Sequence, residues 1–91
     1  MRRIDDTACE MKRMFVYPQL HGQGIGRALA HAVIEKGRVL GYHRMVLDTS
    51  VRQREAQTLY QQCGFTRTEP YYELPADVRE WLVFMELALA P

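Results

Sequence analysis

The sequence has no long apolar run and no excess of charge of one sign. Its apolar runs fall well short of the roughly 18 residues that a membrane-spanning helix needs, so we expect no membrane partner. Twelve Lys and Arg residues against eleven Asp and Glu give a net charge of +1 over 91 residues. Such a balance does not favour nucleic acid as a partner. The N-terminus carries positive charge with no apolar run behind it, so no signal peptide is predicted.

Cysteine is scarce as well. Cys9 and Cys63 have neither CxxC spacing nor a secretory context, and His31 and His43 do not add metal-ligand spacing to them. We therefore expect two reduced thiols, no metal site and a cytoplasmic location. A disulfide between the two cysteines is the less favoured alternative.

What remains is the composition of one small globular domain, with 47% hydrophobic and 25% charged residues. Residues 1–8 are polar and are predicted to be frayed. We expect residues 9–91 to form a single domain. A chain of this length buries only about 60% of its unfolded surface, so any exposed apolar face would favour a partner.

Hydrophobic periodicity predicts the order strand, helix, strand, helix, strand, strand. In the second helix, Ser50 and Gln53 have capping-box spacing, and Gly64 follows the last apolar position. The pattern is typical of an α/β fold, a mixed sheet flanked by two helices with at least one right-handed crossover. The predicted strands cover 9–17, 44–49, 65–72 and 81–89, the first helix covers 25–40, and a loop covers 73–77.

A glycine-rich turn over 18–26 joins the first strand to the first helix. Strand, glycine turn and helix together offer free backbone N–H groups at a positive helix end, which is a site for an anion. The turn lacks the GK[ST] of a Walker loop. It also fails the dinucleotide pattern GxGxxG, because the last position falls on Arg27 or on Leu29. A turn without any ligand is the alternative.

The run FVYPQLHGQGIGRAL, followed by LDTS and then AQTLYQQCGF, resembles the GCN5-related N-acetyltransferase family in order and spacing. The resemblance covers residues 9–89 and corresponds to the second half of that family's domain. It implies a truncated acyl-CoA N-acyltransferase fold that lacks the first strands and the first two helices. The implied activity is transfer of an acetyl group from acetyl-CoA to a primary amine by direct attack. A non-catalytic CoA-binding or interaction module, and a fragment of a longer acetyltransferase, are the alternatives.

The resemblance also implies which residues bind acetyl-CoA. The family's pattern of Arg or Gln, two spacers, Gly, one spacer, and Gly or Ala falls on His21, Gly24 and Gly26, and His21 departs from it. Backbone N–H groups of this turn would bind the pyrophosphate, and the backbone of the preceding strand would pair with the pantetheine arm. The implied residues are Met14, Phe15, Val16, Gly22, Gln23, Gly24, Ile25, Gly26 and Arg27.

Two side chains match catalytic positions of the family. Tyr60 matches a tyrosine near the CoA sulfur, whose phenol would protonate the leaving thiolate. Glu10 matches a strand glutamate that acts as general base, commonly through water. The alternatives are a core tyrosine, and a solvated glutamate paired with Lys12 or Arg13. Gln53 stands where other members carry an asparagine.

The absent first half of the domain would leave the strand over 9–17 without a neighbour on one side. Unpaired N–H and C=O groups on such an edge invite pairing with another chain. We therefore expect a homo-oligomer, formed through this edge or through an apolar face of the sheet. The aromatic residues Tyr71, Tyr72 and Trp81 are interpreted as strand or interface residues, with an acceptor pocket as the alternative.

Overall fold

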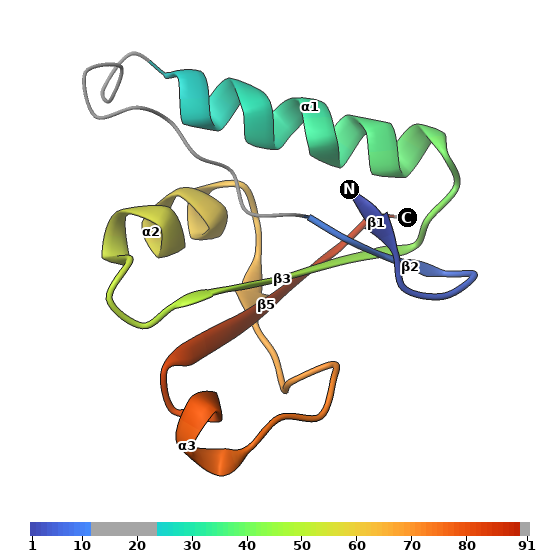
Figure 1. Cartoon of the computed structure of the whole chain (residues 1–91). Coiled ribbons are helices and arrows are strands. Elements are labelled where there is room, and N and C mark those ends of the chain that lie inside the picture. Colours follow the sequence, from blue (N-terminus) through green and yellow to red (C-terminus); the bar gives the residue numbers. More distant parts are fainter. Residues whose placement is uncertain (12–23, 90–91) are drawn as a thin grey trace.

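The computed structural model describes residues 1–11 and 24–89 (Figure 1). In this part of the chain a five-stranded mixed sheet has the order β1-β2-β3-β5-β4. Its strands are β1 Arg2–Arg3, β2 Ala8–Glu10, β3 Arg44–Ser50, β4 Thr66–Arg67 and β5 Leu82–Ala88. The helices are α1 Ile25–Val39, α2 Arg54–Gln62 and the short α3 Ala76–Arg79. The predicted α/β class with a mixed sheet and flanking helices is confirmed.

Strand β1 differs from the frayed segment expected over residues 1–8. It pairs antiparallel with β2, with Arg2 opposite Glu10. The Asp5 carboxylate closes the turn between the two strands by accepting the N–H groups of Thr7 and Ala8, both at 2.8 Å. These backbone hydrogen bonds lower the pKa of Asp5, and the bond from the Thr7 N–H has the largest effect. The expected bare edge is therefore covered by β1 along Cys9 and Glu10, and residues 12–17 of the predicted strand lie outside the described residues.

The strand predicted over 65–72 is much shorter in the structure. Only Thr66 and Arg67 pair with β5, and the Thr68 N–H adds one more bond to the Phe84 carbonyl at 2.9 Å. Pro70 has no N–H to continue the ladder, so the chain leaves the sheet there. The loop predicted over 73–77 instead leads into α3, which begins at Ala76.

The capping box predicted at Ser50 is not formed. The N-cap of α2 is Gln53, and no side chain caps the helix. The Ser50 hydroxyl accepts the N–H of Arg52 at 3.1 Å, while the Gln53 amide oxygen accepts the Thr49 hydroxyl at 2.9 Å. The turn between β3 and α2 is therefore stabilised by local side-chain bonds that the spacing alone did not specify.

The two longer helices cover one face of the sheet (Figure 1). Alternation along β3 and β5 points Met45, Leu47 and Met85 toward these helices, where they pack with Ile34 and Phe65. The other face carries Ala8, Glu10, Val46 and Phe84, and these are buried as well. Both faces of the sheet are thus covered within the described part of the chain.

Helix α1 packs closely on the sheet at Gly37. A Cβ atom placed there would lie 2.8 Å from the Met45 Cε and 3.3 Å from the Cys9 Sγ. Both Cys9 and Cys63 are free thiols, and burial raises the pKa of each. Among the described helices, none is long and apolar enough to cross a membrane.

Candidate active site

The N-terminus of α1 is built by Gly24. Its φ of 74° lies in the left-handed region that glycine adopts without strain, and no side chain caps the helix after it. The Ala28 N–H makes the first helical bond, to the Gly24 carbonyl at 3.0 Å. The N–H groups of Ile25, Gly26 and Arg27 therefore have no acceptor within α1. A Cβ atom at Gly24 would meet nothing within 4 Å among the residues that the structure describes.

The charge around this helix end is suited to an anion. The first turn of α1 contains no acidic residue, although acidic side chains are the usual complement of a positive helix end. The Arg27 guanidinium lies in that turn and donates a hydrogen bond to the Gln62 amide oxygen at the end of α2. The cofactor residues implied at Met14, Phe15, Val16, Gly22 and Gln23, together with His21, lie outside the described residues.

Glu10 projects from β2 onto the face of the sheet opposite α1 and α2. Glu10 is 8% exposed, and each of its two carboxylate oxygens contacts another side chain. The Tyr71 hydroxyl donates to Oε2 at 2.5 Å, and the Arg2 Nε lies 3.0 Å from Oε1. Arg2, from the neighbouring strand β1, therefore forms an ion pair with Glu10, whereas Lys12 and Arg13, the partners named in the alternative interpretation, lie outside the described residues.

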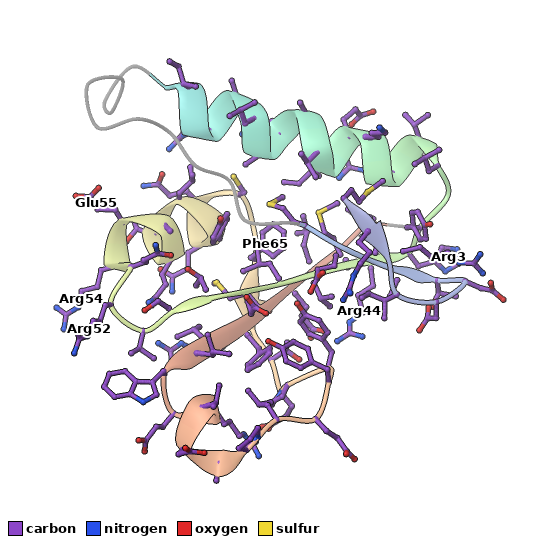
Figure 2. All side chains as sticks on the ribbon, in the orientation of Figure 1. Arg3, Arg44, Arg52, Arg54, Glu55 and Phe65 are labelled. Carbon is purple, nitrogen blue, oxygen red and sulfur yellow. The ribbon has the colours of Figure 1, made fainter. Side chains whose placement is uncertain are left out.

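Tyr60 lies on the other side of the sheet. It belongs to α2, is 6% exposed and packs in the core cluster. Its ring lies edge-on to Phe65 at a centroid distance of 5.9 Å. Figure 2 shows Phe65 near the middle of the molecule. Burial raises the pKa of the Tyr60 phenol, so it remains protonated at neutral pH. The structure thus places Tyr60 and Glu10 on opposite faces and does not bring them into contact.

Between these two faces the pairing of β2 with β3 stops. The parallel ladder runs from Ala8–Arg44 to Glu10–Val46, and the Met11 N–H adds a bond to the Val46 carbonyl at 2.8 Å. Within residues 1–11 and 24–89, no strand pairs with the remainder of β3 on this side. The last ladder pair, Glu10 with Val46, places the Glu10 side chain on one face of the sheet. The next residue of β3, Leu47, points to the other face and packs in the same core cluster as Tyr60.

A cluster of aromatic rings lies beside Glu10. Tyr71, Tyr72 and Phe84 pack edge-to-face at centroid distances of 5.1 to 5.5 Å. The Tyr72 hydroxyl donates to the Asp48 Oδ2 at 2.6 Å, as the neighbouring Tyr71 hydroxyl donates to Glu10. The sequence analysis missed these pairs, because Tyr71 and Glu10 are 61 positions apart and no local pattern links them.

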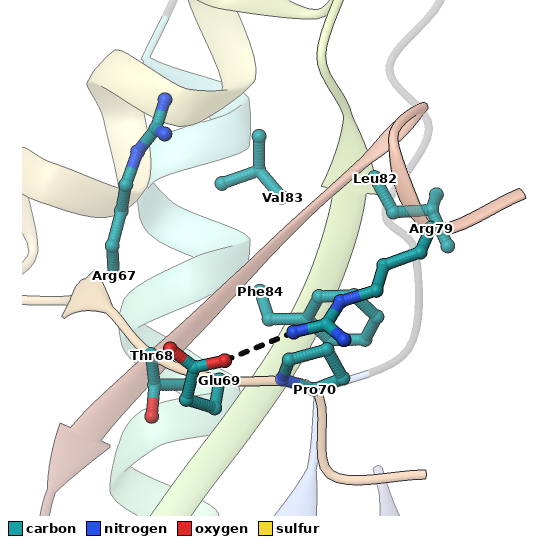
Figure 3. A pocket seen from close by; sticks show the side chains of 8 residues that line it. All are labelled: Arg67, Thr68, Glu69, Pro70, Arg79, Leu82, Val83 and Phe84. Carbon is teal, nitrogen blue, oxygen red and sulfur yellow. Dashed lines mark hydrogen bonds and ion pairs between the residues drawn. The ribbon is translucent and has the colours of Figure 1, made fainter. Parts of the chain in front are cut away.

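A pocket of about 180 Å³ opens between β4, the loop after it and β5 (Figure 3). The Arg79 guanidinium and the Glu69 carboxylate form an ion pair at 3.1 Å across it. This volume is below the roughly 300 Å³ at which small-molecule sites begin, and the pocket contains neither Gly24, Glu10 nor Tyr60. We assign no substrate to it. No cluster of metal-ligating side chains was found among the described residues.

The family follows from a comparison with models of known protein families. The model described as the acetyltransferase (GNAT) family matches residues 1–65. This chain belongs to the GNAT family. The resemblance found in the sequence is confirmed, and the match includes β1 together with the helix end at Gly24 and both candidate catalytic residues.

Relatives of this GNAT chain confirm the fold. An uncharacterised N-acetyltransferase of Schizosaccharomyces pombe is 45% identical over 67 residues, which are 74% of this chain and 41% of that protein. A candidate acyl-CoA N-acyltransferase of Klebsiella pneumoniae is 32% identical with a TM-score of 0.82, over 91% of this chain and 56% of that one. An acetyltransferase of Salmonella typhimurium, solved with acetyl-CoA, is 29% identical with a TM-score of 0.75, over 97% and 53%. The GNAT chain thus spans about half the length of these relatives.

Proposed function

We propose that the chain binds acetyl-CoA and transfers its acetyl group to a primary amine by direct attack. The observation that carries the proposal is the N-terminus of α1 behind Gly24, where the first three N–H groups have no acceptor within the helix and the first turn contains no acidic residue. Such a helix end binds phosphate groups. The Salmonella relative was solved with acetyl-CoA, whose pyrophosphate is an anion of this kind.

The residues at this helix end fit the proposed co-substrate. The N–H groups of Ile25, Gly26 and Arg27 would bind the pyrophosphate, together with Gly22, Gln23 and Gly24 of the turn. Bound acetyl-CoA supplies a thioester whose carbonyl carbon accepts the amine. In our proposal the backbone of Met14, Phe15 and Val16 pairs with the pantetheine arm and polarises that carbonyl.

Glu10 is proposed as the general base. An ionised carboxylate has about four lone-pair sites, of which Arg2 and Tyr71 occupy two. The others can accept the proton that an ammonium group must lose before its nitrogen can attack. Because Glu10 is largely buried, the proton would reach it through a water molecule.

Tyr60 is proposed as the general acid on the opposite face. Its hydroxyl would give a proton to the CoA sulfur as the carbon–sulfur bond breaks. The proton that leaves the nitrogen when the amide forms would restore it, so the phenol is unchanged after each turnover. Its raised pKa keeps the O–H intact over the pH range in which amines lose their protons.

Replacing Gly24 with glutamate is expected to abolish binding of acetyl-CoA. Titration calorimetry should give a dissociation constant in the micromolar range for the unmodified chain, about −8 kcal/mol, and at least about tenfold weaker binding for Gly24→Glu. The new carboxylate would occupy the free N–H groups and repel phosphate.

Gly41→Glu is the matched control for this experiment. Gly41 follows the other end of α1, has a φ of 88° and likewise has no described atom within 4 Å of an added Cβ, so its substitution adds the same charge and a similar backbone strain. We expect its affinity for acetyl-CoA to be unchanged. Equal loss in both variants, or no binding by the folded chain, would contradict the proposed site.

A second candidate function is favoured by the length of the chain. Because the chain spans 41% of the S. pombe relative and 56% of the Klebsiella one, it could be a CoA-binding module or a piece of a longer acetyltransferase. Acetyl-CoA binding without turnover on any amine would support this alternative over the first.

Self-association stays a prediction, and the structure favours one surface for it. The sheet ends on both sides in strands of two residues, β1 and β4, which carry Arg2, Arg3 and Arg67. Short, charged edges disfavour pairing with another sheet. Helix α1 and its C-cap expose Leu29, Val39 and Leu40, which offer an apolar surface for such an association.

A further inference from the structure

The Glu10 carboxylate is held at both oxygens by groups from different segments of the chain. Arg2 comes from β1, whose register with β2 sets it directly opposite Glu10. Tyr71 comes from the loop after β4, 61 positions away.

Packing fixes the Tyr71 hydroxyl in place. The Tyr71 ring contacts Phe84 of β5 at 5.5 Å and Tyr72 at 5.1 Å, both edge-to-face. Burial, and after it the hydrogen bond to Glu10, raises the pKa of Tyr71 far above its usual value. The hydroxyl is therefore a permanent donor, and Glu10 is its acceptor.

The other charged groups of this face are paired separately. Asp48 of β3 accepts a hydrogen bond from Tyr72, and Arg44 of β3 forms an ion pair with Glu86 of β5 at 2.8 Å. Among the described residues, Arg2 and Tyr71 are therefore the groups that contact the Glu10 carboxylate directly.

We propose that Tyr71 and Arg2 are positioning residues, which hold the Glu10 carboxylate oriented to accept the proton of the acceptor amine. This inference rests on the proposed acetyl transfer. Each residue contacts a different carboxylate oxygen, Arg2 at Oε1 and Tyr71 at Oε2, so together they fix the rotation of the carboxylate. They also fix the direction of the lone pairs that remain free.

The test measures kcat and KM for acetyl transfer together with the NMR chemical shift of the Glu10 carboxyl carbon at neutral pH, in a chain labelled at glutamate with Glu10→Gln identifying the signal. In Tyr71→Phe we expect kcat to fall by about tenfold or more with little change in KM, because the carboxylate is then less firmly directed at the amine. The carbon signal should move in the same variant, because one hydrogen bond to the carboxylate is lost. Arg2→Gln should lower kcat and move the signal as well.

Tyr72→Phe is the matched control, because it keeps the ring in the same cluster and removes a hydroxyl that bonds Asp48 instead. We expect kcat and the Glu10 carbon signal to be unchanged in this variant. An unchanged kcat in an active Tyr71→Phe enzyme, or an equal fall of kcat in Tyr72→Phe, would overturn the inference. A change of the carbon signal confined to Tyr71→Phe, in a chain that shows no acetyl transfer even when unmodified, would instead contradict the proposed function.

Discussion

Replacing Tyr60 with phenylalanine is expected to lower kcat for acetyl transfer by about 10²-fold or more, with little change in KM. A positioned general acid contributes roughly 10² to 10⁴ in rate, and the substitution removes only the proton that Tyr60 would donate. The measurement is steady-state release of the CoA thiol with acetyl-CoA and a primary amine as substrates. An equal loss in kcat and in kcat/KM would show that the interaction is made in the transition state.

The fold should tolerate this substitution well. Phenylalanine keeps the ring that lies edge-on to Phe65, so the packing of this ring in the core is retained. We expect the free energy of unfolding to stay within about 0.5 kcal/mol of the unmodified chain. Tyr42→Phe, which also removes a hydroxyl from a tyrosine packed against the core, is the matched control and should leave kcat unchanged. A Tyr60→Phe enzyme with full kcat would restrict Tyr60 to a role in the core.

Local patterns predicted the longest elements correctly. The apolar stripe of α1 recurs at helical spacing and is followed by Gly41, whose φ of 88° ends the helix. Strand β3 was predicted from a compact run of apolar residues, and it is paired on both sides in the structure. In both cases one element's own sequence specifies its period, its limits and its buried face.

Pairings between distant segments could not be predicted in the same way. Strand β1 depends on the Asp5 turn and on its register with β2, and two arginines alone do not indicate a strand. Tyr71 was assigned to a strand because aromatic residues are common there, whereas its ring packs on the sheet face and its hydroxyl contacts Glu10. The candidate site was located through the family resemblance, but the groups that hold Glu10 became visible only in three dimensions.

Truncating Phe65 to alanine is expected to destabilise the fold more than any other substitution considered. Phe65 is 2% exposed and lies where α2, β4 and the core meet, with its N–H bonded to the Tyr60 carbonyl at 3.0 Å. Removing a buried phenylalanine side chain costs about 3–5 kcal/mol. Small domains have only about 5–15 kcal/mol in total. Urea unfolding followed by circular dichroism should therefore show a much lower midpoint, with a large unfolded population at physiological temperature.

Leu40→Ala is the control for Phe65→Ala, because Leu40 is 57% exposed and its truncation should cost less than about 0.5 kcal/mol. A Phe65→Ala chain as stable as this control would contradict the packing described.

Phe65→Leu gives a finer comparison, since it keeps most of the apolar volume and removes the ring edge that contacts Tyr60. If Tyr60 acts as the acid, this variant should fold and still lose part of its kcat, because the phenol is then less firmly held. A variant that loses stability but not kcat would mean that the contact between Phe65 and Tyr60 serves the core alone.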